Sequence, residues 1–314
     1  MQYDRLTSLK TIKVLNKSLW ENRVLQPRID KWLSGFTAGV LSDTTREQDL
    51  ALYLLSRLLY FGSREIRQML NTSYHANVKR QLIENIKSNF NVSAYSNMIE
   101  QEYNTQLMRV RFLGVGNPSE SGTHLLYYYR QENRLPKELF IHADQIFDRS
   151  TGKLEFADES VDWYIFLDDF CGSGEQVGRR LSKLSKEIKE LDGKKRVSYH
   201  MLVATSRGLS EISTVPDIDD HSVVLELDDT FRILDPQSRY LTNFSQQDKT
   251  DIQNVCAKYG TLLFASHPLG YRDCQLLLSF HHNTPDNSLP ILWAPPSSID
   301  WHPVLDRYPK LEFN

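Results

Sequence analysis

Two adjacent acidic residues followed by a glycine-rich turn carry the strongest chemical signal in this sequence. Asp168 and Asp169 end an apolar segment, and Gly172, Ser173 and Gly174 stand just before the next helical pattern. Glycines let a backbone approach an anion closely, and the first turn of a helix presents unbonded N–H groups with partial positive charge. Adjacent carboxylates suit the hydroxyl groups of a ribose, or a magnesium ion with its waters. The pattern therefore predicts a site for a phosphorylated ligand, with a phosphoribosyl group as the preferred candidate.

The segments around this turn predict an α/β domain with a mostly parallel sheet, because strand patterns alternate with helical ones. The strand candidates are residues 107–115, 139–142, 163–167, 197–204, 223–227 and 275–280, and the helix candidates are residues 123–135, 177–191 and 252–259. Ligands bind such sheets at the carboxyl ends of the strands, where the two acids stand. A plain strand-to-helix turn is the alternative, but paired acids and glycines at a strand end cost stability without an evident structural return.

The N-terminal part of the chain has helical patterns only. Thr44 and Glu47 have the spacing of a capping box, and leucines at helical spacing follow between residues 50 and 59. A second apolar stripe repeats at every fourth position: Val78, Leu82, Ile86 and Phe90. Because the pattern changes near residues 91–96, we expect two domains, a helical bundle over residues 1–95 and the α/β domain over residues 96–314.

Charge is divided unevenly along the chain. Residues 1–92 hold 14 Lys and Arg against 8 Asp and Glu, a net charge of +6, and the remainder holds 23 against 32, a net charge of −9. A basic N-terminal part is consistent with an anionic partner, and an ordinary solvated surface is the alternative.

The composition indicates a globular protein of the cytoplasm. Apolar residues make up 40% and charged residues 25%, and no apolar run reaches the roughly 18–20 residues that a membrane helix needs. The first ten residues are polar, so we expect neither export nor a membrane partner. The three cysteines are scattered and form no Cys-x-x-Cys pair, which gives no support for a zinc site or a disulfide framework.

The segment from Tyr164 to Gln176 resembles the signature of the type I phosphoribosyltransferases, in which a hydrophobic strand runs into two acids and a short loop opens a helix. The resemblance implies a fold of that kind, with Asp168 and Asp169 binding the ribose hydroxyls of phosphoribosyl pyrophosphate. It also implies that residues 172–176 wrap the 5′-phosphate. Mg²⁺ would then arrive on the pyrophosphate of the ligand, with no direct side-chain ligand from the protein.

Three positions depart from the signature of that family. Gly172 and Gln176 stand where hydroxyl residues are usual, and Glu175 places a negative charge beside the expected phosphate. These departures argue against efficient catalytic turnover more than they argue against the phosphoribosyltransferase fold.

A second glycine-containing loop is similar to the pyrophosphate-binding loop of the same family. It follows the strand candidate 107–115, and the matching residues are Gly116, Ser121, Gly122 and Thr123. Residues 144–160 would then be the mobile loop that closes over the substrate, with Arg149 or Lys153 meeting the pyrophosphate. A plain surface loop explains those two residues equally well.

The helical N-terminal part and the tail 268–293 resemble the phosphoribosyltransferase-like effectors of bacterial conflict systems, some of which are encoded beside retron reverse transcriptases. This resemblance implies a toxic or nucleotide-modifying role in anti-phage defence. Its implied partners are a reverse transcriptase with retron nucleic acid, or a DNA-binding protein. Within the tail, Tyr271 and Asn283 are candidate contacts for a base, and Thr205, at the end of another strand, is a candidate for the same cleft. A rigid tail with Trp293 in the core is the alternative.

Two other classes compete with a phosphoribosyl enzyme. The run from Asp169 to Gly174 also resembles the S-adenosylmethionine loop of amino-methyltransferases that act on DNA. However, the Asn/Asp-Pro-Pro-aromatic motif of those enzymes is absent, and segment 197–204 ends in Thr205 and Ser206 where an acid is expected. A non-catalytic nucleotide-sensing module of the same fold is the third possibility. Catalysis, by phosphoribosyl transfer or by cleavage of an N-glycosidic bond, is the working hypothesis.

Overall fold

The computed structural model describes residues 4–37, 39–90, 97–116, 121–150 and 152–308, which divide into two compact units. Residues 65–226 form one unit, called here the sheet unit, and residues 1–64 with 227–314 form the other, called the terminal unit. No helix in the described ranges is both long enough and apolar enough to cross a membrane.

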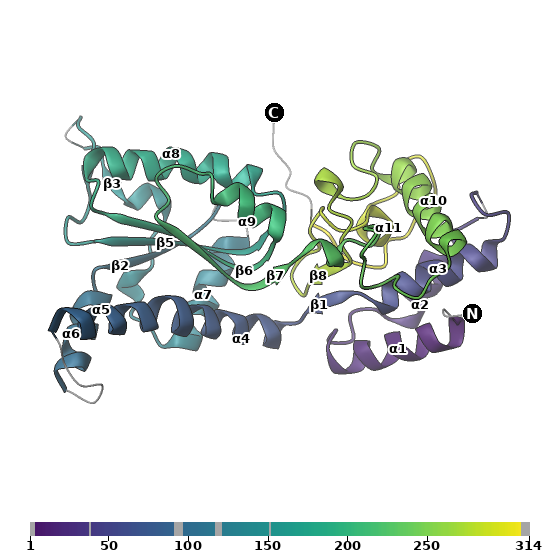
Figure 1. Ribbon diagram of the computed structural model, residues 1–314, viewed down its shortest axis with the longest axis horizontal. Coiled ribbons are helices and arrows are strands. Elements are labelled where there is room, and N and C mark those ends of the chain that lie inside the picture. Colours follow the sequence, from purple (N-terminus) through teal and green to yellow (C-terminus); the bar gives the residue numbers. More distant parts are fainter. Residues whose placement is uncertain (1–3, 38, 91–96, 117–120, 151, 309–314) are drawn as a thin grey trace. The chain divides into compact units, whose positions relative to one another are not determined.

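The sheet unit is built on a four-stranded sheet, in the order β2-β5-β6-β7 (Figure 1). The strands are β2 (Val110–Gly114), β5 (Trp163–Cys171), β6 (Arg196–Thr205) and β7 (Asp220–Leu227). β5 runs parallel to both of its neighbours, with Leu167 opposite Gly114 on β2 and opposite His200 on β6. The predicted α/β architecture with a mostly parallel sheet is confirmed.

Helices cover both faces of this sheet (Figure 1). Helices α8 (Glu175–Leu191) and α9 (Ser206–Ile212) lie on one face. Helices α4 (Ser63–Tyr74), α5 (Arg80–Phe90) and α7 (Ser121–Asn133) lie on the other face. Because both faces of the sheet are covered, every residue of β5 from Trp163 to Leu167 is buried, with successive side chains directed to alternate layers.

Shorter elements complete the sheet unit. A π-helical segment (His75–Lys79) joins α4 to α5, and α6 (Asn97–Leu107) precedes β2. Strands β3 (Phe147–Asp148) and β4 (Glu155–Phe156) pair as a small antiparallel hairpin. The predicted strand over residues 139–142 is wrong: Lys137–Leu139 form a 3₁₀ turn, and Phe140 makes only an isolated bridge to Phe112. Because this turn includes Leu139, too few extended residues remain to form a strand paired by several hydrogen bonds.

The terminal unit combines the two ends of the sequence. The N-terminal part supplies α1 (Arg5–Ser18), α2 (Gln26–Leu33), α3 (Thr44–Ser56) and β1 (Leu59–Phe61). The C-terminal part supplies η4 (Asp229–Phe231), α10 (Gln246–Leu263), η5 (Tyr271–Asp273), β8 (Leu278–Phe280) and α11 (Pro290–Trp293). β1 and β8 pair in parallel, and the rings of Phe61 and Phe280 stack with centroids 5.5 Å apart.

This division differs from the boundary expected at residues 95 and 96. Helices α4 and α5 belong to the sheet unit, where Tyr74 packs edge-on against Phe112 of β2. The leucines of α3 share one core with Ile252 and Val255 of α10, in the terminal unit. The helical N-terminal part is therefore split between two cores instead of forming a bundle of its own.

The start of α3 shows how the N-terminus of one helix is satisfied. The side chain of Asp43, not of Thr44, accepts the N–H groups of Thr45 and Arg46, at 2.9 and 3.2 Å. Glu47 does not reach back as in a capping box. Its fully buried carboxylate accepts the N–H groups of Val40 and Leu41, so it fixes the chain that leads into the helix.

We expect Asp43→Ala to lower the free energy of unfolding of the terminal unit by about 1 kcal/mol, the usual effect of losing an N-cap. The matched change Thr44→Ala should cost less, because Thr44 is exposed and Asp43 holds the cap. Urea denaturation followed by tryptophan fluorescence measures both. Equal losses in the two variants, or a larger loss for Thr44→Ala, would contradict this assignment.

Candidate functional site

The two acids lie at the carboxyl end of the central strand β5, and both are buried, with 9% of each residue exposed. One carboxylate oxygen of Asp168 accepts the hydroxyl proton of Tyr199, on β6, at 2.9 Å. The other accepts the backbone N–H of Asp169 at 3.0 Å. The side chains of Asp168 and Asp169 also interact with each other, so the two carboxyl groups lie close together at this strand end.

Burial raises the pKa of Asp168 well above its ordinary value, and the charge of Asp169 beside it raises that pKa further. Hydrogen-bond donation from Tyr199 opposes the shift without reversing it. Burial also raises the pKa of Tyr199, so its hydroxyl remains a donor. The end of β5 therefore holds negative charge at an energetic cost, which a ligand rich in hydroxyl groups, or a cation, relieves.

The turn after β5 has the geometry of an anion cradle. Gly174 has φ = +76°, in the left-handed region that favours glycine, and it is the N-cap residue of α8. Glycine has no side chain, so no N-cap side chain bonds the first N–H groups of α8. These groups and the helix dipole favour a negative ligand. Ser173, which is 8% exposed, adds a hydroxyl to the turn, whereas Glu175 adds a negative charge to the first turn of α8.

Helix α9 fixes the shape of this turn. The hydroxyl of Thr205, the N-cap of α9, donates to the carbonyl of Gly172 at 2.6 Å and accepts the N–H of Gly208 at 2.9 Å. A Cβ atom at Gly208 would lie 2.6 Å from the Gly172 carbonyl oxygen and 2.7 Å from that of Cys171. The absence of a side chain at Gly208 therefore lets α9 touch the backbone of the turn directly.

The end of β2 lies beside the end of β5, since the N–H of Val115 donates to the carbonyl of Leu167 at 3.1 Å. The next residue, Gly116, also has a left-handed backbone, with φ = +105°. The second predicted loop thus starts at the same edge of the sheet as the acids. Ser121, Gly122 and Thr123 form the first turn of α7, and residues 117–120 lie outside the described residues.

The hairpin β3–β4 occupies the segment predicted to close over a substrate. The Arg149 guanidinium lies over the Phe147 ring and 3.4 Å from the carboxylate of Glu187, on α8. Movement of this hairpin toward a ligand stays a prediction, as does a role for Lys153.

Two predicted contacts belong to the terminal unit, not to the unit that holds the acids. The side-chain oxygen of Asn283 accepts the N–H groups of Thr284 and Tyr308, each at 3.0 Å. The Tyr271 ring packs edge-on against His267, with ring centroids 4.7 Å apart. Trp293 is 5% exposed and donates its indole N–H to the Ser288 carbonyl, so it is a core residue.

In the ranges that the structure describes, no group of three or more His, Cys, Asp or Glu side chains is arranged to hold a metal ion. Two adjacent carboxylates are compatible with the usual coordination of Mg²⁺, which binds one or two carboxylates together with phosphate oxygens of a ligand.

Sequence reasoning missed two residues of this site. Tyr199 lies on the strand next to the acids, and Gly208 lies one turn into the short helix that follows it. The strand pattern of residues 197–204 did not single out Tyr199, because Ser198 and His200 on either side of it are polar as well. The close approach of Gly208 depends on tertiary packing and had no local signal.

Comparisons with known proteins agree with a phosphoribosyltransferase-like chain. The model of a family described as PRTase-CE matches residues 29–307. No curated protein sequence is significantly similar to this chain. Among solved structures, the AQ2163 protein of Aquifex aeolicus is 10% identical, with 65% of this chain and 86% of that chain covered and a TM-score of 0.28. The xanthine-guanine-hypoxanthine phosphoribosyltransferase of Helicobacter pylori is 14% identical, with 43% and 90% covered and a TM-score of 0.23. At these TM-scores the two structural likenesses carry no argument about this chain.

We expect Gly208→Ala to destabilise the sheet unit by about 1–3 kcal/mol, the usual cost of overpacking. The new Cβ meets backbone oxygens, which cannot rotate away as a side chain can. Chemical denaturation measures the loss. The control is Gly193→Ala, where the nearest atom is 3.9 Å from the new Cβ. If the two variants are equally stable, α9 does not pin the turn as described.

The raised pKa of Asp168 predicts how its replacement depends on pH. An acid whose pKa is higher in the folded protein than its value of about 3.9 in the unfolded chain destabilises the fold as pH rises between the two values. Asn at position 168 keeps both hydrogen bonds, because its amide group can donate to the Tyr199 oxygen and accept from the Asp169 N–H.

The melting temperature of Asp168→Asn minus that of the wild type should therefore be more positive at pH 8 than at pH 5. Calorimetry at the two pH values tests this expectation. A difference that is constant, or that falls as pH rises, would show that Asp168 titrates near its ordinary value.

Proposed function

We propose a function for this protein from one established premise: the chain belongs to the PRTase-CE family and is phosphoribosyltransferase-like. In this proposal the carboxyl end of β5 binds a phosphoribosyl ligand, either phosphoribosyl pyrophosphate or a nucleotide. Asp168 and Asp169 accept hydrogen bonds from the two ribose hydroxyls, and the turn from Gly172 to Gly174 receives the 5′-phosphate.

One observation carries the proposal. Paired carboxylates, a left-handed glycine and the N-terminus of α8 without a side-chain cap follow one another within a single strand–turn–helix segment. A ribose 5-phosphate presents the complementary groups in the same order, two hydroxyls and then a dianion. An S-adenosylmethionine site requires neither a phosphate cradle nor two acids in succession, and the family match does not favour that alternative.

The reaction consistent with this site breaks the bond between C1 of the ribose and a leaving group, while C1 forms a new bond to an acceptor nucleophile or to water. With phosphoribosyl pyrophosphate the leaving group is pyrophosphate, and in this proposal it is received near Gly116, which follows β2 at the same edge of the sheet as the acids. Mg²⁺ held by the pyrophosphate oxygens, with Asp168 and Asp169 nearby, would supply positive charge against the departing anion. Preorganised N–H groups at the turn stabilise charge without reorganisation during the step.

A sensing role without catalysis is the second candidate, and specific observations favour it. Asp168 is already satisfied by Tyr199 and by the Asp169 N–H. Gly172 and Gln176 also replace the hydroxyl residues usual in the enzymes. A ligand that displaces Tyr199 from Asp168 would change the packing between β5 and β6, and such a change is how a sensor reports occupancy.

The biological setting that we propose is anti-phage defence, with a retron-type reverse transcriptase and its nucleic acid, or a DNA-binding protein, as partners. This setting is supported by the resemblance of the N-terminal part and the tail to conflict-system effectors. The basic residues among positions 1–92 are the proposed electrostatic contribution, and they are divided between the two units.

The test is calorimetric titration with phosphoribosyl pyrophosphate and magnesium, using wild type and the double variant Asp168→Asn, Asp169→Asn. Each charge-assisted hydrogen bond that is lost is worth about 1.5–3 kcal/mol, so binding by the double variant should fall below detection. The control Asp217→Asn makes the same chemical change at an exposed position of the sheet unit whose φ of +66° suits Asn.

Unchanged affinity in the double variant would remove the proposed ribose site. Tight binding of S-adenosylmethionine with no response to phosphoribosyl pyrophosphate would support the methyltransferase alternative. A parallel assay for pyrophosphate release separates catalysis from sensing, because a sensor binds the ligand without releasing pyrophosphate.

A further inference from the structure

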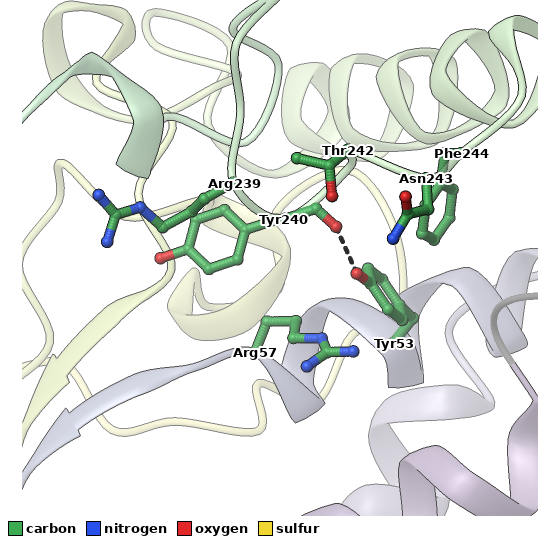
Figure 2. Close-up of a pocket in the computed structure, with 7 residues that line it drawn as sticks. All are labelled: Tyr53, Arg57, Arg239, Tyr240, Thr242, Asn243 and Phe244. Carbon is green, nitrogen blue, oxygen red and sulfur yellow. Dashed lines mark hydrogen bonds between the residues drawn. The ribbon is translucent and has the colours of Figure 1, made fainter.

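The terminal unit contains a cavity that the proposed phosphoribosyl site does not use. Its volume is about 420 Å³, within the range of about 300–1,000 Å³ typical of small-molecule sites. Two segments line it (Figure 2): the last turn of α3, with Tyr53 and Arg57, and the chain from Arg239 to Phe244 that leads into α10. Tyr53 lies in the last turn of α3 and Arg57 is the C-cap residue of that helix, and the Arg57 guanidinium lies over the Tyr53 ring.

Aromatic rings form the walls of this cavity. The Tyr53 and Phe244 rings lie with centroids 4.8 Å apart, and the Tyr53 hydroxyl donates to the backbone carbonyl of Tyr240, which joins the two segments. Tyr240 contributes a third ring (Figure 2). Burial raises the pKa of Tyr240 to about 12, so its hydroxyl is a neutral donor at physiological pH. Flat rings of this kind are the surfaces on which nucleic-acid bases stack.

The charge lining the cavity is positive. Arg57 is exposed, and its guanidinium lies 4.9 Å from the centre of the Tyr53 ring, an arrangement that leaves the edge of the guanidinium open to a phosphate. Among the described residues Arg57 forms no ion pair. Arg239, the second cation, is partly neutralised by Asp228 at 3.4 Å. No carboxylate lines the cavity, so an anion entering it meets Arg57 as the stronger attraction.

Polar groups complete the lining. The side chains of Thr242 and Asn243 extend toward the Tyr53 hydroxyl (Figure 2), and both residues are exposed to solvent. A carboxamide presents a donor and an acceptor together, which is the pattern that recognises the edge of an adenine. Rings for a base, an amide for its edge and a guanidinium for a phosphate are the three elements of a nucleotide site.

We propose that the cavity between the end of α3 and residues 239–244 is a second ligand site that binds a nucleoside monophosphate. The base lies among the rings of Tyr53, Tyr240 and Phe244, and the phosphate is bound by Arg57. The site lies in a different unit from Asp168 and Asp169, so it is separate from the phosphoribosyl site.

The experiment titrates adenosine monophosphate into the double variant Asp168→Asn, Asp169→Asn, in which the other site is disabled, and then into the same protein with Arg57→Gln or Arg64→Gln added. Both arginines are exposed, and Arg64 does not line the cavity, so the two changes remove the same charge inside and outside the proposed site. We expect Arg57→Gln to weaken binding about tenfold or more, because a hydrogen bond to a charged group is lost, and Arg64→Gln to leave it unchanged.

A second variant, Asn243→Asp, adds a carboxylate at an exposed position and should also weaken binding, without affecting the core. Adenosine and inorganic phosphate are the partial ligands, and each should bind more weakly than the nucleotide. The proposal is overturned if adenosine monophosphate fails to bind at millimolar concentration, or if Arg57→Gln and Arg64→Gln bind it equally. It is also overturned if inorganic phosphate binds as tightly as the nucleotide, or if only a single-stranded oligonucleotide binds.

Discussion

The candidate site depends on the close contact between helix α9 and the turn that follows β5. Thr205 and Gly208 meet the carbonyls of that turn at distances that leave no room for a side chain at Gly208. The carbonyl of Gly172 accepts the Thr205 hydroxyl on the α9 side, which fixes the orientation of the turn. The left-handed backbone of Gly174 is part of the same constraint, because a Cβ there would lie 2.8 Å from that of Glu211 on α9. Two glycines in two elements are therefore needed to build one anion cradle.

The paired acids place buried negative charge beside the N–H groups of this turn. The backbone N–H groups at the start of α8 carry partial positive charge. Asp168, in contrast, is a carboxyl group buried at the end of β5, and burial raises its pKa. Tyr199 compensates part of the cost of burying that charge. In the proposal, a ligand with two hydroxyl groups beside a phosphate donates hydrogen bonds to the buried carboxylates. Its phosphate accepts hydrogen bonds from the N–H groups of the turn. The cavity at Arg57, proposed to bind a nucleotide, is lined instead by exposed cations and aromatic rings, with no buried carboxylate.

Local patterns predicted the strand, the turn and the helix around the two acids better than they predicted how distant parts of the chain pack. The apolar strand through Leu167, the Gly-Ser-Gly turn and the helical stripe of α8 are contiguous in sequence, so their order was readable from residues alone. Contacts between segments that are distant in sequence could not be read in the same way. The pairing of β1 with β8 joins three-residue strands from the two ends of the chain, and no local pattern indicated it when a helical domain was expected over residues 1–95. The capping of α3 by Asp43 was missed by one position, because Thr44 has equal capping chemistry and only the backbone geometry distinguishes them.

Nuclear magnetic resonance of backbone amides tests the central claim most directly, since that claim concerns N–H groups. Ribose 5-phosphate added to the labelled protein should shift the amide signals of Gly172, Ser173, Gly174 and the first turn of α8, in proportion to occupancy. The same titration should leave the Arg57 region almost unchanged. Shifts confined to other parts of the chain, with the turn after β5 unaffected at saturation, would contradict the account of this turn as a phosphate cradle.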